Sequence, residues 1–371
     1  MSASTVRGRV SWTVAAPILG MVLLAATWGR HLDGLLVPVV AVFLIAAVLA
    51  AVHHAEVVAH KVGEPFGSLI LAVAVTVIEV ALIVTLMITG SADGTDTSGL
   101  ARDTVFAAIM ISINGIVGVS LLVGALRHHL AVFNPEGTGS ALATVIALAG
   151  ITLVLPRFTT SEAGPEFAPG QLAFAAVASL ALYGMFVFTQ TVRHRDFFLP
   201  VDAGGELLDE DGDGHADPPS GRQALQSLAL LTVALVAVVG LAKVESPAIE
   251  DAVESAGLPH AVVGVVIALL VLLPESIAAV RAAAGGRAQT SLNLAYGSAM
   301  ASIGLTIPTI AVASIWLEGP LALGLEPMQI VLLFLSVIVS LLTVVPGRAK
   351  PLQGGVHLVL LAAFLAVTIA P

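Results

Sequence analysis

Long runs of apolar residues, each close to twenty positions in length, recur along this chain, and the short segments between them hold most of its charges. A bilayer core needs about 20 consecutive apolar residues per helical span, and inside lipid the backbone polar groups must be paired within the helix. Hydrophobic residues make up 57% of the 371 positions and charged residues only 11%. The runs therefore predict an all-α polytopic membrane protein.

We expect eleven transmembrane helices. The first run is nearly twenty residues long and lacks a clear small-x-small cleavage site, which favours a retained helix over a cleaved signal sequence. The expected spans cover residues 11–28, 35–52, 66–90, 103–124, 140–155, 171–192, 223–242, 260–280, 292–316, 328–345 and 354–370.

The basic residues predict the orientation of these spans. With the N-terminus inside, the inner segments hold eleven Lys and Arg and the outer segments hold four. This bias places the N-terminus in the cytoplasm and the C-terminus outside, in what we expect to be a bacterial cytoplasmic membrane. The net charge of −10 argues against a nucleic-acid partner, and the absence of cysteine removes disulfides and thiolate metal sites.

The spans divide into an N-terminal helix and two groups of five. We expect an N-terminal transmembrane helix in residues 1–30, a five-helix repeat in 31–192, an acidic cytoplasmic linker in 193–222 and a second five-helix repeat in 223–371. An odd number of spans per repeat makes the two repeats enter the membrane in opposite directions. Inverted repeats of this kind are a transporter architecture.

Two carboxylates fall well inside the expected spans, Glu79 and Glu275. Glu79 follows Pro65 by 14 residues and Glu275 follows Pro259 by 16, so the two acids occupy equivalent places in the two repeats. A charged group near the bilayer centre costs ~2.5–3.5 kcal/mol on insertion scales, which makes each acid a functional candidate. Because the repeats are inverted, both acids can approach each other near the midplane.

Other oxygen ligands are expected beside this pair. Pro274 should break the second acid-bearing helix and free a carbonyl of Leu270 or Val271. The spans that follow the two acids carry small polar residues whose oxygens could complete a cation shell. They are Ser112 and Asn114 in the first repeat, and Asn293, Ser298, Ser302 and Thr306 in the second.

Charge arithmetic favours calcium as the ion for this pair. Two glutamates supply a charge of −2 and up to four oxygens, while calcium accepts about six to eight oxygens at ~2.3–2.6 Å. Without calcium, two nearby carboxylates in a low dielectric repel each other, so we expect protons to bind in its place. If only the neutral forms let the two repeats rock between inward and outward states, transport becomes obligatory exchange of calcium for protons.

The sequence also carries a family resemblance. The segment GEPFGSLILAVAVTVIEVALIV, residues 63–84, and the segments LPES and SLNLAYGSAMASIGLTIP within residues 273–308 resemble the two alpha repeats of the calcium:cation antiporter superfamily. Within it they are similar to the bacterial calcium/proton and sodium/proton antiporters of the ChaA type. The resemblance implies that Glu79 and Glu275 are the paired ion-binding acids and that the proton is the counter-ion.

These observations predict a secondary active antiporter that exchanges cytoplasmic Ca²⁺ for H⁺, with membrane lipid as its surroundings and no cofactor besides the transported ions. A Na⁺/H⁺ or K⁺/H⁺ antiporter on the same scaffold stays open as the alternative, and so does the oligomeric state. A cation channel and an intramembrane enzyme rank below both. A channel normally comes from repeated subunits, and no span offers a nucleophile with a base or an H-E-x-x-H pair.

An acidic stretch in the linker suggests a second role for calcium. Asp209, Asp211, Asp213 and Asp217 match the spacing of an EF-hand loop, but Ser220 stands where a bidentate Glu should close the shell. A truncated regulatory calcium loop and a solvated acidic linker both stay open. The group His53, His54, Glu56 and His60 matches no defined metal site, and we expect solvated interfacial side chains there.

Overall fold

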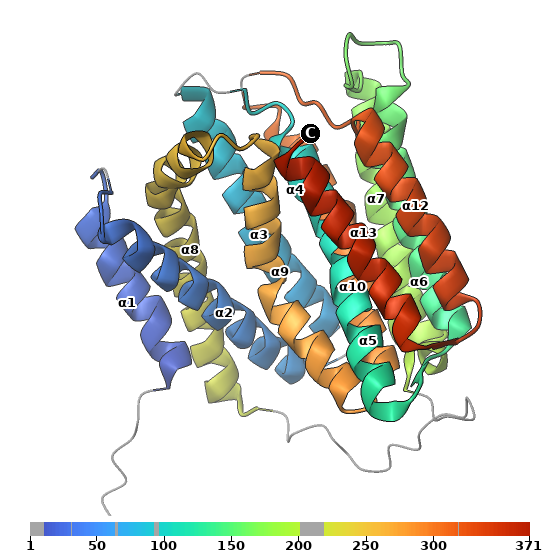
Figure 1. Cartoon of the computed structure of the whole chain (residues 1–371). Helices are drawn as coiled ribbons and strands as arrows, with labels where there is room; N and C mark the ends of the chain where they lie inside the picture. Colours follow the sequence, from blue (N-terminus) through green and yellow to red (C-terminus); the bar gives the residue numbers. More distant parts are fainter. Residues whose placement is uncertain (1–10, 31, 64–65, 93–95, 201–218, 318) are drawn as a thin grey trace, which may run out of the picture.

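The computed structural model describes residues 11–30, 32–63, 66–92, 96–200, 219–317 and 319–371, which form an almost wholly helical bundle (Figure 1). Ten of the described helices are long and apolar enough to cross a membrane, and the shorter apolar helix α1 (Trp12–Thr27) precedes them. The predicted all-α polytopic membrane protein is confirmed. Apolar side chains such as Phe334, Leu342 and Val359 are exposed on the outer faces, where lipid would cover them.

The first two long spans are α2 (Leu36–Val62) and α3 (Phe66–Ala92). The third consists of α4 (Leu100–Met110), the π-helix η1 (Ile111–Ile116) and α5 (Val117–His128). The fourth is α6 (Pro135–Ala149) with η2 (Gly150–Val154) and η3 (Leu155–Arg157), and the fifth is α7 (Pro169–Phe188) with η4 (Thr189–Arg193), followed by η5 (Arg195–Phe198). The last five are α8 (Gly221–Ser255), α9 (Ala261–Ala284), α10 (Ala288–Gly304) with α11 (Thr306–Ala313), α12 (Pro327–Val344) and α13 (Pro351–Ile369).

The connections between the helices lie at the two ends of the bundle. We call the end where η5 finishes and α8 begins the linker end, and the end where α8 finishes and α9 begins the far end. Helix α1 begins at the linker end and the chain finishes at the far end (Figure 1). The boundaries of the two five-helix repeats stay a prediction.

Local capping explains where several spans begin. Pro stands at the first helical position of α6, α7, α12 and α13, where its missing N–H costs no hydrogen bond. Asn134 caps α6 because its side chain accepts from the backbone N–H of Glu136 at 2.9 Å. At α8, the Ser220 hydroxyl accepts from the Gln223 N–H at 3.3 Å while the Gln223 side chain accepts from the Ser220 N–H at 2.9 Å.

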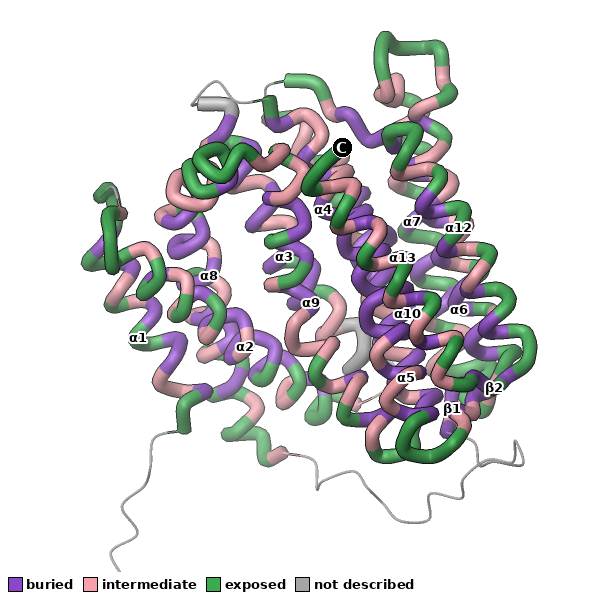
Figure 2. Tube along the Cα trace, in the orientation of Figure 1, coloured by how far each residue is buried: buried purple, intermediate pink, exposed green. Residues whose placement is uncertain are grey.

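The helices pack around two separate cores. One core lies among α1, α2, α8 and the facing parts of α3 and α9, and the other lies among α4 to α7 and α10 to α13. Figure 2 shows the buried residues along the contacts between helices and the exposed ones on the outer faces. Small residues bring α1 and α8 close together, since a Cβ placed on Gly20 would lie 3.4 Å from the Ala237 methyl group. Helices α1, α2 and α8 therefore form one packed body.

A buried histidine ties these three helices together. The His54 ring on α2 lies 3.3 Å from the Ser227 hydroxyl of α8 through Nδ1 and 3.0 Å from the Thr13 carbonyl of α1 through Nε2. His54 is only 3% exposed, so the expectation of a solvated side chain is wrong here. Its partners lie 41 and 173 residues away along the chain, and sequence spacing carries no sign of them.

Two expectations about helix limits are also wrong. The seventh span does not end at residue 242: α8 continues to Ser255, because the polar segment after the apolar run is still rich in good helix formers. Helix α9 is continuous through Pro274 instead of broken there. It packs against α4 and α10, and such packing lets a membrane helix keep a proline.

A short antiparallel pairing lies outside the predicted helices. Strand β1 (Ala131–Val132) follows α5, strand β2 (Arg348–Ala349) precedes α13, and Ala131 pairs with Ala349. The pairing holds the connections before α6 and α13 against each other. His129, just before β1, has a φ of 66°, a conformation that allows the sharp exit from α5.

Candidate cation site

Glu79 lies in the middle of α3 and is 1% exposed. The Thr306 hydroxyl donates a hydrogen bond of 2.9 Å to its Oε2 atom, and the Ser302 side chain also faces this carboxylate. Thr306 reaches Glu79 because the span breaks at Leu305, whose φ of −111° separates α10 from α11. The break therefore places a hydroxyl donor on the buried acid.

Glu275 lies in α9, and its charge interacts with that of Glu79. Its Oε2 atom is buried without a hydrogen-bond partner. The side chain lines a cavity of about 230 Å³ together with Asn293 and Ser298 of α10. Gln190, near the end of the α7 span, and Thr290, near the start of α10, also line it, which places the cavity in the half of the bundle toward the linker end.

The two acids thus have unequal surroundings. Ser298, Ser302 and Thr306 are spaced four residues apart along α10 and α11, which puts them in one row. The row brings Ser298 to the cavity of Glu275 and presents Ser302 and Thr306 to Glu79. Asn293 lines the cavity as well, so four of the small polar residues named from the sequence lie beside the acid pair.

Asn114 and Ser112 lie elsewhere in the same bundle, within η1. The Asn114 amide nitrogen donates to the Ser336 hydroxyl of α12 at 2.8 Å, and the Asn114 oxygen lies 3.2 Å from Nδ1 of His357 in α13. Nε2 of His357 in turn lies 3.2 Å from the Thr343 hydroxyl. Both ends of the Asn114 amide are therefore engaged by α12 and α13. The Ser112 hydroxyl is fully buried and has no hydrogen-bond partner.

Sequence reasoning missed the partners of Asn114, and it also missed a polar pattern that the two halves share. The pattern Ser-x-Asn-x-x-x-Gly occurs in both halves, at Ser112 to Gly118 and at Ser291 to Gly297. Asn293, the second asparagine, donates to the Phe198 carbonyl at 2.7 Å and accepts from Gln289 at 2.8 Å. Asn114 thus anchors its span to α12 and α13, while Asn293 anchors α10 to the end of η5.

Two further polar residues in the spans were missed. Thr76 stands one turn before Glu79, and its hydroxyl is buried without a partner. Glu245 of α8 is 3% exposed, and its Oε2 atom has no hydrogen-bond partner either. A third acid is therefore buried in a spanning helix. It escaped notice because the expected span ended at residue 242.

The donor set limits how a metal ion could be held. Over the residues that the structure describes, no group of three or more His, Cys, Asp or Glu side chains could hold a metal ion. A cation at Glu79 and Glu275 would need neutral oxygens to complete its shell. Asp209, Asp211, Asp213 and Asp217 lie outside the described residues.

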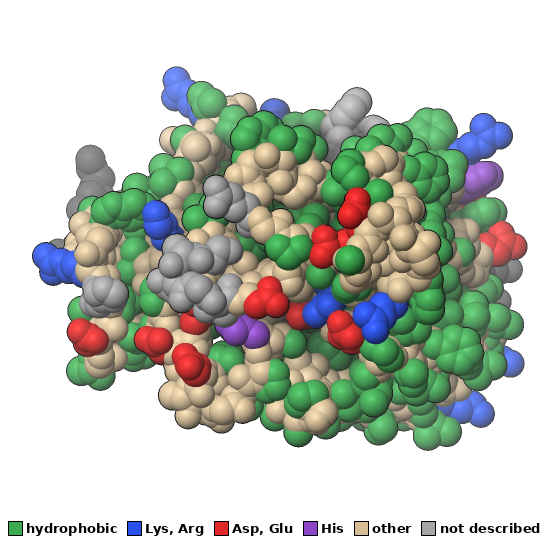
Figure 3. Space-filling view, turned by 90° about the horizontal axis from the view of Figure 1, so that it is seen from above, with side chains coloured by type: hydrophobic (Ala, Val, Ile, Leu, Met, Phe, Trp, Pro, Cys, Tyr) green, Lys and Arg blue, Asp and Glu red, His purple; other side chains and the backbone are tan. Residues whose placement is uncertain are grey.

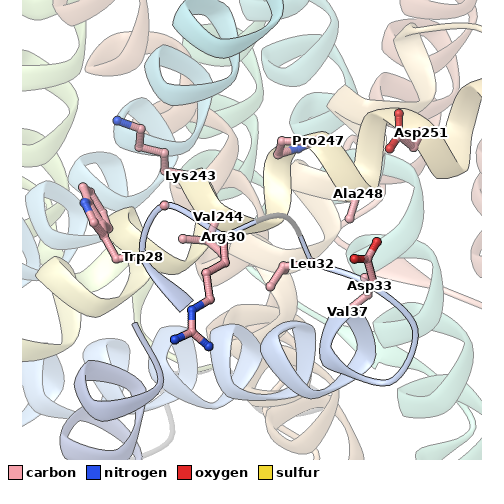
Figure 4. A pocket seen from close by; sticks show the side chains of 11 residues that line it. Trp28, Arg30, Leu32, Asp33, Val37, Lys243, Val244, Pro247, Ala248 and Asp251 are labelled. Carbon is pink, nitrogen blue, oxygen red and sulfur yellow. The ribbon is translucent and has the colours of Figure 1, made fainter. Parts of the chain in front are cut away.

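A larger cavity of about 530 Å³ lies between the end of α1 and the second half of α8 (Figure 4). Its lining includes the cationic side chains Arg30 and Lys243 as well as Asp33 and Asp251. The ammonium group of Lys243 lies 5.2 Å from the centre of the Trp28 ring, within range of a cation–π contact. This cavity shares no lining residue with the Glu79 and Glu275 site, and its two basic and two acidic side chains balance in charge.

A bundle of apolar spans that holds two interacting carboxylates within its helices is typical of one class of protein, the membrane-embedded ion transporters. The model of the family described as sodium/calcium exchanger protein matches residues 34–192 and 226–370. The chain therefore belongs to the sodium/calcium exchanger family, within the calcium:cation antiporter superfamily. The two matched segments each hold one of the paired acids.

Relatives in sequence cover almost the whole chain. The protein y4hA of Sinorhizobium fredii is 45% identical over 367 residues, which are 97% of this chain and 96% of the relative. The sodium-potassium/proton antiporter ChaA of Escherichia coli is 34% identical over 94% of this chain and 93% of its own length. A Ca²⁺/H⁺ antiporter of Aphanothece halophytica is 24% identical over 73% of this chain and 74% of its own length.

Solved structures share the fold. Native YfkE superposes with a TM-score of 0.72 at 15% identity, over 97% of this chain and 99% of the other. The H⁺/Ca²⁺ exchanger CAX gives a TM-score of 0.70 at 13% identity, over 95% of this chain and 86% of the other. At these identities the similarity shows the fold alone.

Proposed function

We propose that this chain is a cation/proton antiporter that exchanges Ca²⁺ for H⁺ across a bacterial cytoplasmic membrane by alternating access. The observation that carries the proposal is the pair Glu79 and Glu275, two acids on equivalent membrane helices whose charges interact. A charge of −2 matches one divalent cation or two protons. Calcium and protons therefore compete for one site.

Oxygens of the acid pair and of the side chains beside it support a hydrated or partly hydrated cation. The buried oxygens of Thr76 and Glu275 have no partner in the protein, so they are free to bind an ion. Ser298 and Ser302 add hydroxyls on the α10 side. Calcium tolerates such irregular oxygen shells, with water in the remaining positions.

The exchange needs a barrier against the empty, doubly charged site. Crossing the low-dielectric core with two unpaired carboxylates is costly, whereas the calcium-loaded and doubly protonated sites are neutral.

The cavity beside Glu275 lies toward the linker end, which corresponds to an inward-facing state if the N-terminus is cytoplasmic. We propose the orientation with the N-terminus inside and the C-terminus outside.

A Na⁺/H⁺ or K⁺/H⁺ antiporter is the second candidate, favoured by the name of the relative that is 34% identical over 94% of this chain. A monovalent cation would leave one carboxylate for a proton.

Everted membrane vesicles with a pH-sensitive dye separate the two candidate functions. A proton flux that Ca²⁺ triggers and Na⁺ or K⁺ does not would assign calcium, and the reverse would assign the monovalent ion.

The same vesicles test the acid pair. Glu79→Gln and Glu275→Gln should each abolish the cation-triggered proton flux, since each removes one of the two charges on which the exchange depends. Glu162→Gln, in an exposed loop, is the matched control and should keep the flux. Robust exchange by either of the first two variants would overturn the proposed site.

A further inference from the structure

Two glutamates outside the Glu79 and Glu275 pair occupy equivalent places in the two halves. Glu56 stands nine residues before Pro65 and Glu250 stands nine residues before Pro259, and each proline comes just before the helix with a paired acid. Glu56 lies toward the end of α2 and Glu250 toward the end of α8. Since α2 finishes at the linker end and α8 at the far end, the two acids lie on opposite sides of the membrane-spanning bundle (Figure 1).

Glu56 is an exposed carboxylate at the linker end. Its charge interacts with that of Glu275, whose Oε2 atom is buried without a partner. Besides Glu275, the charged neighbours of Glu56 are His53 and His60, both on its own helix α2. Glu56 thus adds an exposed carboxylate on the linker-end side of the bundle, near enough to Glu275 for their charges to interact.

Hydrogen bonds connect Glu250 with α3, the helix that carries Glu79. Its Oε1 atom accepts a hydrogen bond of 3.1 Å from the Ser246 hydroxyl, which lies 2.8 Å from the Thr89 hydroxyl of α3. Thr89 follows Glu79 by ten residues on the same helix, a rise of about 15 Å. A row of oxygens therefore connects Glu250 with the helix that carries Glu79.

The surroundings of Glu250 are acidic. It lines a cavity of about 420 Å³ with Asp251, Glu254 and His260, and acidic side chains gather on this face of the molecule (Figure 3). Asp96 lies close by at the same end, and hydrogen bonds from the side chain and backbone of Ser98 hold the pKa of Asp96 below its usual range. This carboxylate is therefore ionised near neutral pH. An entrance lined by charges of one sign raises the local concentration of ions of the opposite sign.

We propose that Glu56 and Glu250 are the entry ligands of the two access routes, each holding a cation in passing before it reaches Glu79 and Glu275. Glu56 serves the linker end and Glu250 the far end. The proposal rests on the exchange proposed above and deepens it. A transient site must be weak enough to release its ion onward, and a carboxylate near the end of the bundle, open to water, meets this need.

Sided transport measurements test this assignment. Right-side-out and everted vesicles containing the full chain are given Ca²⁺ on the bath side, and the Ca²⁺ concentration for half-maximal proton flux is measured from each face. Glu56→Gln should raise this concentration about five-fold from one face, and Glu250→Gln about five-fold from the opposite face. Both effects should shrink at high ionic strength, because salt screens such charges.

Each variant carries its own folding control, since the face with the native glutamate should keep the value of the unmodified protein. Asp251→Asn is the matched control, because Asp251 adjoins Glu250 and lines the same cavity, whereas the residue equivalent to it in α2 is the apolar Val57. Glu56→Asp and Glu250→Asp keep the charge and should recover most of the affinity.

Three outcomes would overturn the assignment: an equal effect from both faces, no effect from either face, or an equal effect of Asp251→Asn and Glu250→Gln. If the unmodified protein showed no cation-driven proton flux with Ca²⁺, Na⁺ or K⁺, the proposed exchange itself would fail. The failure of the entry ligands alone is therefore distinguishable from the failure of the antiporter.

Discussion

Thr306→Val removes the one hydroxyl whose hydrogen bond to Glu79 is resolved at 2.9 Å. Thr306 is fully buried and Glu79 is 1% exposed, so water has little room to replace the lost donor. A hydrogen bond to a charged group contributes about 1.5–3 kcal/mol. Without this donor the ionised form of Glu79 loses that stabilisation, so protons compete more strongly with the cation for the site. At 1.4 kcal/mol per factor of ten, we expect the cation concentration for half-maximal exchange to rise roughly ten- to hundredfold.

The assay is the cation-triggered proton flux in everted vesicles, titrated with Ca²⁺. Thr306→Ser keeps the hydroxyl and should restore most of the affinity. Thr309→Val is the matched control on the same helix, because the Thr309 hydroxyl is exposed and donates to the Leu305 carbonyl. A Thr306→Val protein with unchanged half-saturation, or a Thr306→Ser protein as impaired as Thr306→Val, would refute the role of this hydroxyl.

Three further predictions concern other parts of the molecule. Gly354→Ala should destabilise the detergent-solubilised protein by about 1–3 kcal/mol in a thermal unfolding experiment, because its Cβ would lie 2.6 Å from the Leu122 nitrogen; Gly355→Ala, which meets nothing within 4 Å, should not. Glu245→Met should stabilise the fold by about 1 kcal/mol in the same experiment, because it removes a buried oxygen without a partner, and a clear loss of stability would contradict this. Deletion of residues 209–217 should change the half-saturating Ca²⁺ concentration and leave exchange intact, whereas loss of all exchange in a folded deletion would place the acidic stretch in the transport path itself.

The sequence predicts what depends on local rules. The spans follow from apolar length, and Glu79 and Glu275 stand out because a carboxylate in such a run has a high desolvation cost. Ser298, Ser302 and Thr306 were within reach too, since their spacing matches one face of a helix. The two glutamates are related by similar distances from a proline, and the three hydroxyl residues are related by spacing along one span. Both kinds of relation can be read from the sequence.

Tertiary contacts decide what the sequence could not show. Asn114 meets His357 across 243 residues, and no spacing rule connects them. The burial of Glu245 depends on the helices that pack against α8, while hydropathy alone ends the span before it. Pro274 was expected to break its helix from its own chemistry, but packing by neighbouring helices keeps α9 intact.

The unequal surroundings of the two acids bear on the energetics of the transport cycle. Two identical inverted halves would interconvert by an exchange of roles, so their inward- and outward-facing conformations would have equal free energies. Here Glu79 accepts a hydroxyl from α11, while an oxygen of Glu275 stays unpaired. In the proposed alternating-access cycle, this asymmetry would remove the degeneracy and give the unloaded protein a preferred conformation, so that cation binding from the two sides would start from different free energies.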